Sequence, residues 1–275
     1  MLAAPMRFEV QHLSRYDYSL PVALGSHVLR LVPQGPALNL VWRELYIEPW
    51  PKSQIIEVDS YDNEVLRVEF SGQTNHLSIR SRFDAHTVEE PPIEGSWYLL
   101  PWNNPAIESS SSDPEVAAFA ADVSARVGGH VIAFLDALSL ELFTRTDRQV
   151  RPLGNAQTPL ETLRTRHGAC RDLTLLYMEC CQSVGLLARF VSGYQAAADT
   201  PDGQRHLHAW PEVHLPGMGW RGWDPTHGMR VDTGHVRLCA APSQLETMPV
   251  EGGYTFFGAE LTSTLTYEVR IATTG

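Results

Sequence analysis

The sequence has no long apolar run and no cluster of basic residues. It contains no stretch of 18 apolar residues, and its first residues lack a charged segment followed by an apolar one. We therefore expect neither a membrane-spanning helix nor a secretory signal. Lys and Arg number 21 against 32 Asp and Glu, which gives a formal net charge of -11. Because phosphate is bound by clustered Lys and Arg, we expect no nucleic acid and no membrane among the partners.

Cysteine is also scarce, at 4 residues in 275. Three of them, Cys170, Cys180 and Cys181, fall on one predicted helix. A ten-residue offset there separates two sulfurs by about 15 Å, which is too far for a disulfide. Few cysteines without a framework of regular spacings are typical of the reducing cytosol, so we expect a cytoplasmic protein.

What the chain does contain is an ordinary globular composition, with 43% apolar and 19% charged residues, in a length that favours two domains. Period-two alternation fills the first third, as in Met6, Phe8 and Val10 against polar neighbours, and it indicates half-buried strands. Residues 61–64 fit a hairpin turn. The first third is therefore predicted to be an antiparallel, β-sandwich-like domain.

Prolines and small polar residues then predict a linker, because this composition sustains neither a sheet nor a helix. It contains Pro91, Pro92, Pro101, Pro105, the pair Asn103-Asn104 and the serines at 109–112. We predict a β-rich domain over residues 1–105, a core over 106–260 and a C-terminal strand over 261–275. We expect that last strand to return to the N-terminal domain.

Four helices are predicted in the core, from cap residues, early prolines and apolar positions at helical spacing. They start at Asp113-Pro114-Glu115, span Val131–Phe143, run from the capping box at Thr158 to about Arg166, and run from about Ala169 to Val184. Gly185 is well placed just beyond the end of the fourth helix. Alternating strands follow it, so the predicted fold class is α+β.

Cys170 lies in the run His167-Gly168-Ala169-Cys170-Arg171-Asp172, directly ahead of the fourth helix. Unpaired N–H groups and the helix dipole favour a thiolate at this end and can lower the thiol pKa from about 8.5. Gly168 lets the backbone turn sharply, and the N–H of Cys170 is aimed at an oxyanion formed by attack on a carbonyl. We predict a nucleophile here; the alternative is a small buried apolar residue.

His208 and Asp224 lie in two predicted strands joined by a tight reversal at residues 216–219. If the loop has an odd number of residues, the two side chains share a face with Cβ atoms about 7 Å apart; if it is even, they do not. His208 suits proton transfer at neutral pH, and Asp224 would orient it. The order Cys170, His208, Asp224 predicts a catalytic triad, with His206 and His214 as competitors for the role of the base.

Other interpretations of these residues remain open. The alternate histidines with Glu212, or the pair Cys180-Cys181, could bind zinc. No C-x-x-C or H-E-x-x-H spacing is present, so we predict no metal and no cofactor. Arg171 and Asp172 are predicted to be structural. Five tryptophans could line a substrate groove or simply pack in the core: Trp97, Trp102, Trp210, Trp220 and Trp223.

Several runs carry a family resemblance, in order and over about seventy residues. They are Thr158-Pro159, then His167–Leu173, Gly185–Tyr194, His208–Val213 and Gly219–Thr226. In these runs the chain resembles the bacterial transglutaminase-like superfamily. Residues 7–10 and 29–33 are similar to the β-rich N-terminal domain of many bacterial members. The sequence departs from the family pattern at Arg166, where members often carry a glycine.

The resemblance implies a papain-like α+β core in which Cys170 is the nucleophile, His208 the general base and acid, and Asp224 the orienting carboxylate. It also implies acyl transfer from an amide through a thioester, with a peptide or protein as substrate. We expect hydrolysis by a peptidase or amidase, because water is always present and the sequence shows no amine site or calcium loop. A transglutaminase and a catalytically silent peptide-binding protein are the alternatives.

Overall fold

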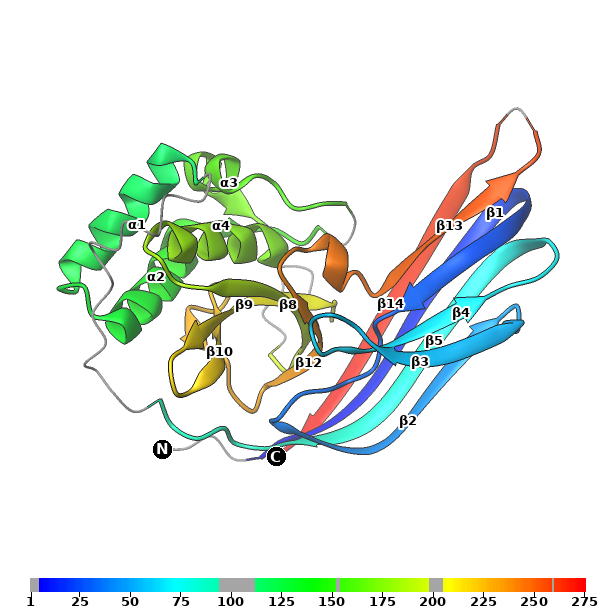
Figure 1. Ribbon diagram of the computed structural model, residues 1–275, viewed down its shortest axis with the longest axis horizontal. Coiled ribbons are helices and arrows are strands. Elements are labelled where there is room, and N and C mark those ends of the chain that lie inside the picture. Colours follow the sequence, from blue (N-terminus) through cyan, green and yellow to red (C-terminus); the bar gives the residue numbers. More distant parts are fainter. Residues whose placement is uncertain (1–4, 94–111, 152–153, 198–204, 259) are drawn as a thin grey trace.

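The computed structural model describes residues 5–93, 112–151, 154–197, 205–258 and 260–275. The predicted linker falls largely on residues 94–111, so the expected boundary at 105, Trp97 and Trp102 lie outside the described residues. Four helices cover one face of a small sheet, and the long strands of a larger sheet extend away from them (Figure 1). None of the described helices is long and apolar enough to cross a membrane.

The larger sheet is organised around one long strand, β1 (Arg7–Leu29). Over residues 7–18, β1 pairs antiparallel with β5 (Thr74–Thr87) on one side and β14 (Ser263–Thr274) on the other. Its second half pairs with β4 (Glu64–Glu69) and β13 (Val250–Phe256). The last two strands of the chain are therefore part of the same sheet as the first.

Two further strands complete this sheet: β2 (Leu38–Glu48) pairs with β5, and β3 (Ser53–Val58) pairs with β4 across the predicted hairpin. The antiparallel pairing agrees with the prediction, but the described strands form one continuous curled sheet instead of a sandwich of two. The reason is that β1 runs through both halves, with register irregularities between residues 17 and 22 and between 24 and 27. Such bulges bend a strand without ending it.

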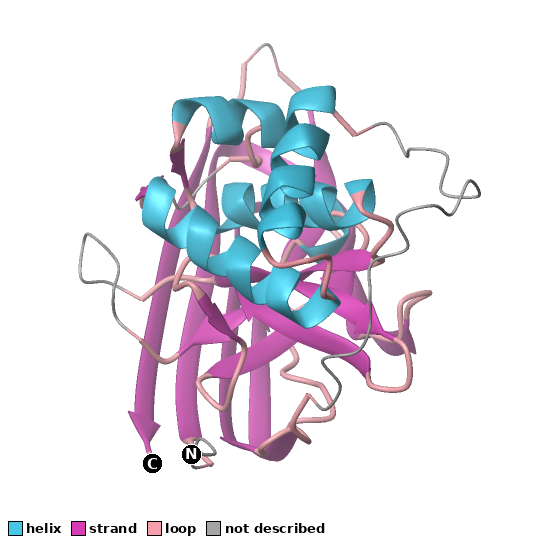
Figure 2. Cartoon of the chain, turned by 90° about the vertical axis from the view of Figure 1, so that its left-hand side faces the viewer, coloured by secondary structure: helices cyan, strands magenta, loops and turns pink. Residues whose placement is uncertain are grey.

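The core of the smaller part contains helices α1 (Pro114–Arg126), α2 (Val131–Arg145), α3 (Pro159–Thr165) and α4 (Cys170–Ser183). The predicted caps are confirmed, because the Asp113 and Thr158 side chains accept from the N–H groups of Glu115 and Glu161. Only α2 differs noticeably, since it continues two residues beyond Phe143. In Figure 2 the helices lie together in front of the strands.

The helices pack on a five-stranded sheet, mainly through α4, whose buried face includes Leu173, Leu176 and Tyr177. The strand order is β11-β10-β9-β8-β12. The strands are β8 (Ala188–Gln195), β9 (His208–Leu215), β10 (Gly219–Asp224), β11 (Met229–Arg230) and β12 (His235–Ala241).

The two sheets contact each other through one apolar cluster, separate from the cluster that joins the helices to the small sheet. Tyr194 of β8 and Val236 and Leu238 of β12 are buried in the same cluster as Phe8 and Val10 of β1. This packing holds β1 and β14 against the edge of the small sheet, next to the N-terminus of α4.

Candidate active site

Cys170 is the first residue of α4, one residue later than the predicted helix start. Its side chain is half-buried, whereas Cys180, Cys181 and Cys239 are buried. The first N–H groups of a helix have no partner within the helix, so the backbone at Cys170 presents donors and positive potential beside the sulfur. The thiol is therefore both reachable and placed where a thiolate is stabilised.

The loop before Cys170 is held by Asp172, which is fully buried. Its carboxylate accepts from the backbone N–H of Ala169 at 2.7 Å and of Gln157 at 2.8 Å, and it pairs with Arg151 at 2.6 Å. A Cβ at Gly168 would lie 3.2 Å from Cβ of Asp172, so a larger residue would press on this cap. Asp172 thus has the structural role that the sequence predicts.

Arg166, where the sequence departs from the family pattern, has φ 56° and ends α3 in the left-handed conformation. Glycine adopts this conformation freely, whereas another residue pays about 1–2 kcal/mol. The backbone N–H of Arg166 still bonds to the carbonyl of Thr162 at 3.0 Å, and its carbonyl accepts from Asp147 at 2.8 Å. The loop therefore keeps the turn that a glycine would give.

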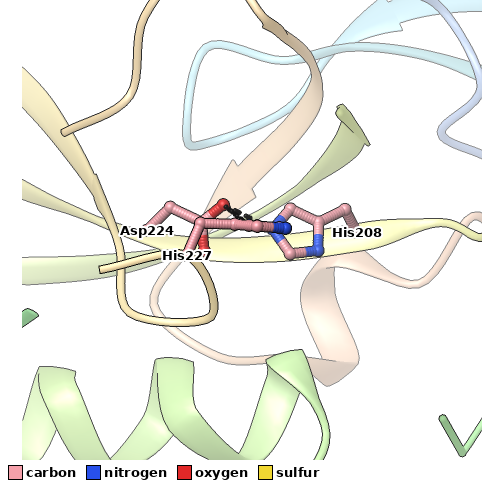
Figure 3. Close-up of side chains that lie close together, drawn as sticks. All are labelled: His208, Asp224 and His227. Carbon is pink, nitrogen blue, oxygen red and sulfur yellow. Dashed lines mark hydrogen bonds and ion pairs between the residues drawn. The ribbon is translucent and has the colours of Figure 1, made fainter. Parts of the chain in front are cut away.

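His208 and Asp224 come together across the β9–β10 hairpin. The strands are joined by the three residues 216–218, with Gly219 opposite Leu215 and Gly222 opposite Glu212. This is the odd loop length that the triad requires, and His208 Nε2 lies 2.8 Å from Asp224 Oδ2 (Figure 3). Nδ1 of His208 is then the ring nitrogen that Asp224 does not engage, and His208 lines the same cavity as Cys170.

Asp224 is fully buried and has more partners than the sequence suggested. Its Oδ2 also receives His227 Nδ1 at 2.8 Å and His235 Nε2 at 3.1 Å, and Oδ1 accepts from the Thr226 N–H at 2.9 Å. His227 sits three residues after Asp224 in the same turn, a spacing that could have revealed it. His235 arrives from β12, and no local signal in the sequence connects it with Asp224.

The electrostatics of these groups favour a thiolate–imidazolium pair. Burial acts to raise the pKa of Cys170, but the hydrogen bond and charge of His208, then Arg171 and the Ala209 N–H, outweigh it and lower the pKa. Burial acts to lower the pKa of His208, but the Asp224 charge and hydrogen bond, with Cys170, raise it to about 10. The three histidines hold the pKa of Asp224 well below its ordinary value despite burial.

The other cysteines behave in the opposite way. Burial raises the pKa of Cys180 and Cys181, and it raises the pKa of Cys239 to about 12. Among the four thiols, Cys170 is thus the one whose surroundings favour the reactive form.

The competing histidines have other contacts. His206 lines the cavity around Cys170, but its ring stacks on the Tyr267 ring, with the two ring centres 6.4 Å apart. His214 packs against Trp220, and Glu212 is bound by Arg189 at 2.6 Å. The strand histidines and Glu212 therefore do not converge on one point, as a zinc site of these residues would need.

A different group has the spacing of metal ligands: His208, Asp224 and His227, whose ligand atoms lie within 4.8 Å of one another. Both ring nitrogens already lie at hydrogen-bond distance, 2.8 Å, from the same carboxylate oxygen (Figure 3). Hydrogen bonds from the two imidazole rings to Asp224 account for this arrangement without an ion. The sequence-based expectation of no metal and no cofactor stays a prediction.

Gly193 of β8 lies opposite His208 in the strand ladder and is expected to be essential for the site. A Cβ there would lie 2.2 Å from the Val236 carbonyl oxygen and 2.5 Å from the Trp210 ring. We expect Gly193→Ala to destabilise the protein by about 3 kcal/mol through overpacking, measured as a fall in Tm. Gly253→Ala, which meets nothing within 4 Å, is the control, and equal Tm values for both variants would contradict the prediction.

A cavity of about 330 Å³ opens at Cys170 and His208, and both parts of the chain line it. Tyr16 of β1, with Leu265 and Tyr267 of β14, contributes an apolar wall from the larger sheet. The Tyr267 hydroxyl accepts from the Leu207 N–H at 2.5 Å, directly before His208. The N-terminal and C-terminal strands are therefore part of the site and not a separate module.

Four arginines line the same cavity: Arg148, Arg151, Arg171 and Arg205. Trp210 and Trp223 do not line it, because both are core residues with 1% and 0% exposure. Neither therefore forms an aromatic wall at Cys170, and Trp220, which is half-buried, lines a different cavity.

The chain is similar to known proteins over both of its parts. Residues 8–86 match the bacterial transglutaminase-like N-terminal region, and residues 119–225 match the transglutaminase-like superfamily. An uncharacterized protein of Mycobacterium tuberculosis is 25% identical over 280 residues, covering 91% of this chain and 88% of its own length. One of Mycobacterium leprae is 21% identical over 273 residues, covering 92% and 95%.

A crystal structure from Cytophaga hutchinsonii, of a protein described as a candidate cysteine protease, has the same fold. The TM-score is 0.71 at 15% identity, and the match covers 98% of this chain and 91% of that one. At this coverage the likeness includes the larger sheet as well as the smaller sheet and its helices.

Proposed function

Because this chain belongs to the transglutaminase-like superfamily of cysteine-based acyl-transfer enzymes, we propose that it cleaves amide bonds by hydrolysis through a thioester on Cys170. Cys170 is the nucleophile, His208 the general acid and base, and Asp224 the group that orients and charges His208. The observation that carries this proposal is the position of Cys170 at the start of α4, in the same cavity as a His208 ring that Asp224 holds at 2.8 Å.

The first half of the reaction forms the acyl-enzyme. The Cys170 thiolate attacks the amide carbonyl carbon, and the developing oxyanion accepts from the Cys170 N–H at the helix start. The imidazolium of His208 donates its proton to the leaving nitrogen as the C–N bond breaks. Asp224 keeps the ring in position through the 2.8 Å bond to Nε2, so Nδ1 is the nitrogen that carries this proton.

The second half releases the acyl group. The now neutral His208 removes a proton from water, and the oxygen attacks the thioester carbonyl. The C–S bond breaks, the carboxylic acid leaves, and the thiolate with its imidazolium partner is restored. The buried Asp224 stabilises that imidazolium, since its own charge is held by three histidines.

Hydrolysis is favoured over transamidation by the charge of the cavity. A protein amine arrives largely as an ammonium ion, because the ordinary pKa of Lys is about 10.4. Arg148 and Arg205 line the cavity at Cys170 and repel such a cation, whereas water is unaffected. This supports water as the acceptor of the acyl group.

The test offers both acceptors at once. The protein is incubated with a peptide library containing internal amide bonds and glutamine side chains, together with fluorescent cadaverine, and mass spectrometry identifies the products. We expect hydrolysed products to exceed amine-labelled ones at least about tenfold, and none with Cys170→Ala. An excess of amine-labelled peptides would make the protein a transglutaminase. Peptide binding that Cys170→Ala leaves unchanged, with no products, would make it a binding protein.

A further inference from the structure

The cavity at Cys170 has the opposite charge to the protein as a whole. Four arginines contribute to its lining, and no Asp or Glu side chain does among the described residues. The chain itself carries 32 acidic and 21 basic side chains. A cleft with low-dielectric walls and charges of one sign concentrates ligands of the other sign.

Two of the arginines are held by backbone carbonyl oxygens. Arg148 Nη1 donates to the carbonyl of Thr226 at 2.8 Å, and its guanidinium lies 4.4 Å from the centre of the Phe143 ring. Arg205 donates to the carbonyls of Gln195 and Ala196. Neither forms an ion pair with a carboxylate of the described residues. Carbonyl oxygens orient a guanidinium without cancelling its charge.

The other two arginines differ. Arg151 is neutralised by the ion pair with the buried Asp172, 2.6 Å away. Arg171 is itself buried, donates to the carbonyl of Arg151 and contributes to lowering the pKa of Cys170. These two serve the loop and the thiol, so Arg148 and Arg205 are the pair available to a ligand.

Arg148 and Arg205 line the cavity that also contains Cys170 and His208. Arg148 is in β6 (Asp147–Arg148), which pairs with β7 (His167–Gly168) of the loop before Cys170. Arg205 precedes His208 by three residues. A substrate whose carbonyl carbon reaches Cys170 therefore occupies the cavity that both guanidinium groups line. A planar guanidinium matches a carboxylate through two parallel hydrogen bonds.

From these observations, and resting on the proposed function, we propose that the substrate is acidic: a peptide with a carboxylate next to the amide bond that Cys170 attacks. Arg148 and Arg205 bind that carboxylate and determine specificity. The apolar wall of Tyr16, Leu265 and Tyr267 contacts the uncharged part of the same substrate. The carboxylate belongs either to an Asp or Glu side chain or to the peptide's C-terminus.

Two small alkylating agents of similar size test the charge preference directly. Iodoacetate is an anion and iodoacetamide is neutral, and both modify the same thiol. The two alkylation rates at Cys170 are measured by intact mass. The iodoacetate rate is divided by the iodoacetamide rate, and this ratio is divided by the same ratio measured for the small neutral thiol N-acetylcysteinamide. We expect this normalised ratio to be about 10 or more. It should fall several-fold in Arg148→Gln and in Arg205→Gln and further in the double variant.

The iodoacetamide rate serves as the control for folding and for the thiolate–imidazolium pair, which remain in each variant. Arg164→Gln is the matched surface variant, because Arg164 of α3 is 60% exposed and pairs with Glu115. It should leave the ratio unchanged. A ratio near 1, or one that the double variant does not lower, would overturn the acidic-substrate proposal alone. Failure of Cys170 to react with either reagent would overturn the proposed function and this inference with it.

Matched peptides then distinguish the two sources of the carboxylate. Each peptide is offered with Glu or Gln beside the scissile bond and with a free or amidated C-terminus. A loss of kcat/KM of tenfold or more on Glu→Gln, reduced in the double arginine variant, identifies an acidic side chain. The same loss on amidation identifies the terminus. Equal turnover of all four peptides would contradict the proposal.

Discussion

At pH 7, iodoacetamide is expected to modify Cys170 at least about a thousandfold faster than Cys180, Cys181 or Cys239. Only the thiolate reacts, and with a pKa of about 12 the Cys239 thiol contributes a thiolate fraction near 10⁻⁵ at this pH. The pKa of Cys170 is lowered by His208, and its side chain is half-buried where the others are buried. Peptide mapping after a short exposure measures the four rates separately.

The pH dependence of this labelling gives the control. The Cys170 rate should rise with pH and reach half its maximum below about 8.5, the ordinary pKa of a thiol. Cys170→Ala should remove the fast phase and leave Tm close to that of the unmodified protein. Comparable rates at all four cysteines, or a midpoint above 8.5, would mean that Cys170 is not activated.

The second large effect is expected for Asp224→Asn, which should reduce turnover by about 100- to 1000-fold. Without the carboxylate charge, burial lowers the pKa of His208 from about 10, and the imidazolium that holds the Cys170 thiolate is lost near neutral pH. The loss is smaller than the ~10⁴ of a serine triad, because a thiol needs less help from a base. Alkylation of Cys170 at pH 6 should fall in parallel, with its midpoint moved to higher pH.

A matched surface pair provides the control for this substitution. Asp147 also bonds to a histidine, His167, at 3.1 Å, but its side chain is 70% exposed. Asp147→Asn should leave the alkylation profile of Cys170 unchanged. An Asp224→Asn enzyme with full activity, or an equal effect of both substitutions, would remove Asp224 from the proposed triad.

The stability lost in Asp224→Asn should itself depend on pH. The pKa of Asp224 is depressed, so its contribution is complete above the ordinary value of 3.8 and is lost as the pH falls. The pKa of His208 is raised to about 10, so its contribution is complete below 6.5 and is lost as the pH rises toward 10. The difference in unfolding free energy from the unmodified protein should therefore be largest between about pH 4 and 6.5, as denaturant titrations at several pH values would show.

Local features were within reach of the sequence because local physics decides them. Cap residues fixed the starts of α1 and α3, and the helix that begins at Cys170 followed from its apolar spacing and from Gly185. The hairpin before β4 followed from turn residues and alternation. Side chains within a few residues of one another determine all of these. The same local signals also identified Cys170, His208 and Asp224 as the candidate catalytic residues.

Such local signals could not predict contacts between segments that are distant in the sequence. Alternation in residues 6–84 predicts strands but is equally compatible with two stacked sheets and with one curled sheet. Pairing with β13 and β14 decides between them, and those strands come from the other end of the chain. His235 reaches Asp224 for a similar reason, since β12 is placed beside β8 by long-range packing.

The sequence by itself determined the helix that presents Cys170 and the two strands that carry its partners, because caps, turns and periodicity act over a few residues. Only the tertiary structure decided that the hairpin loop has three residues, so that His208 meets Asp224, and that Arg148 and Arg205 face the same cavity. These outcomes depend on strand register and on the packing of β1 and β14 against the small sheet. Register and packing minimise the free energy of the whole chain, and no short segment contains that information.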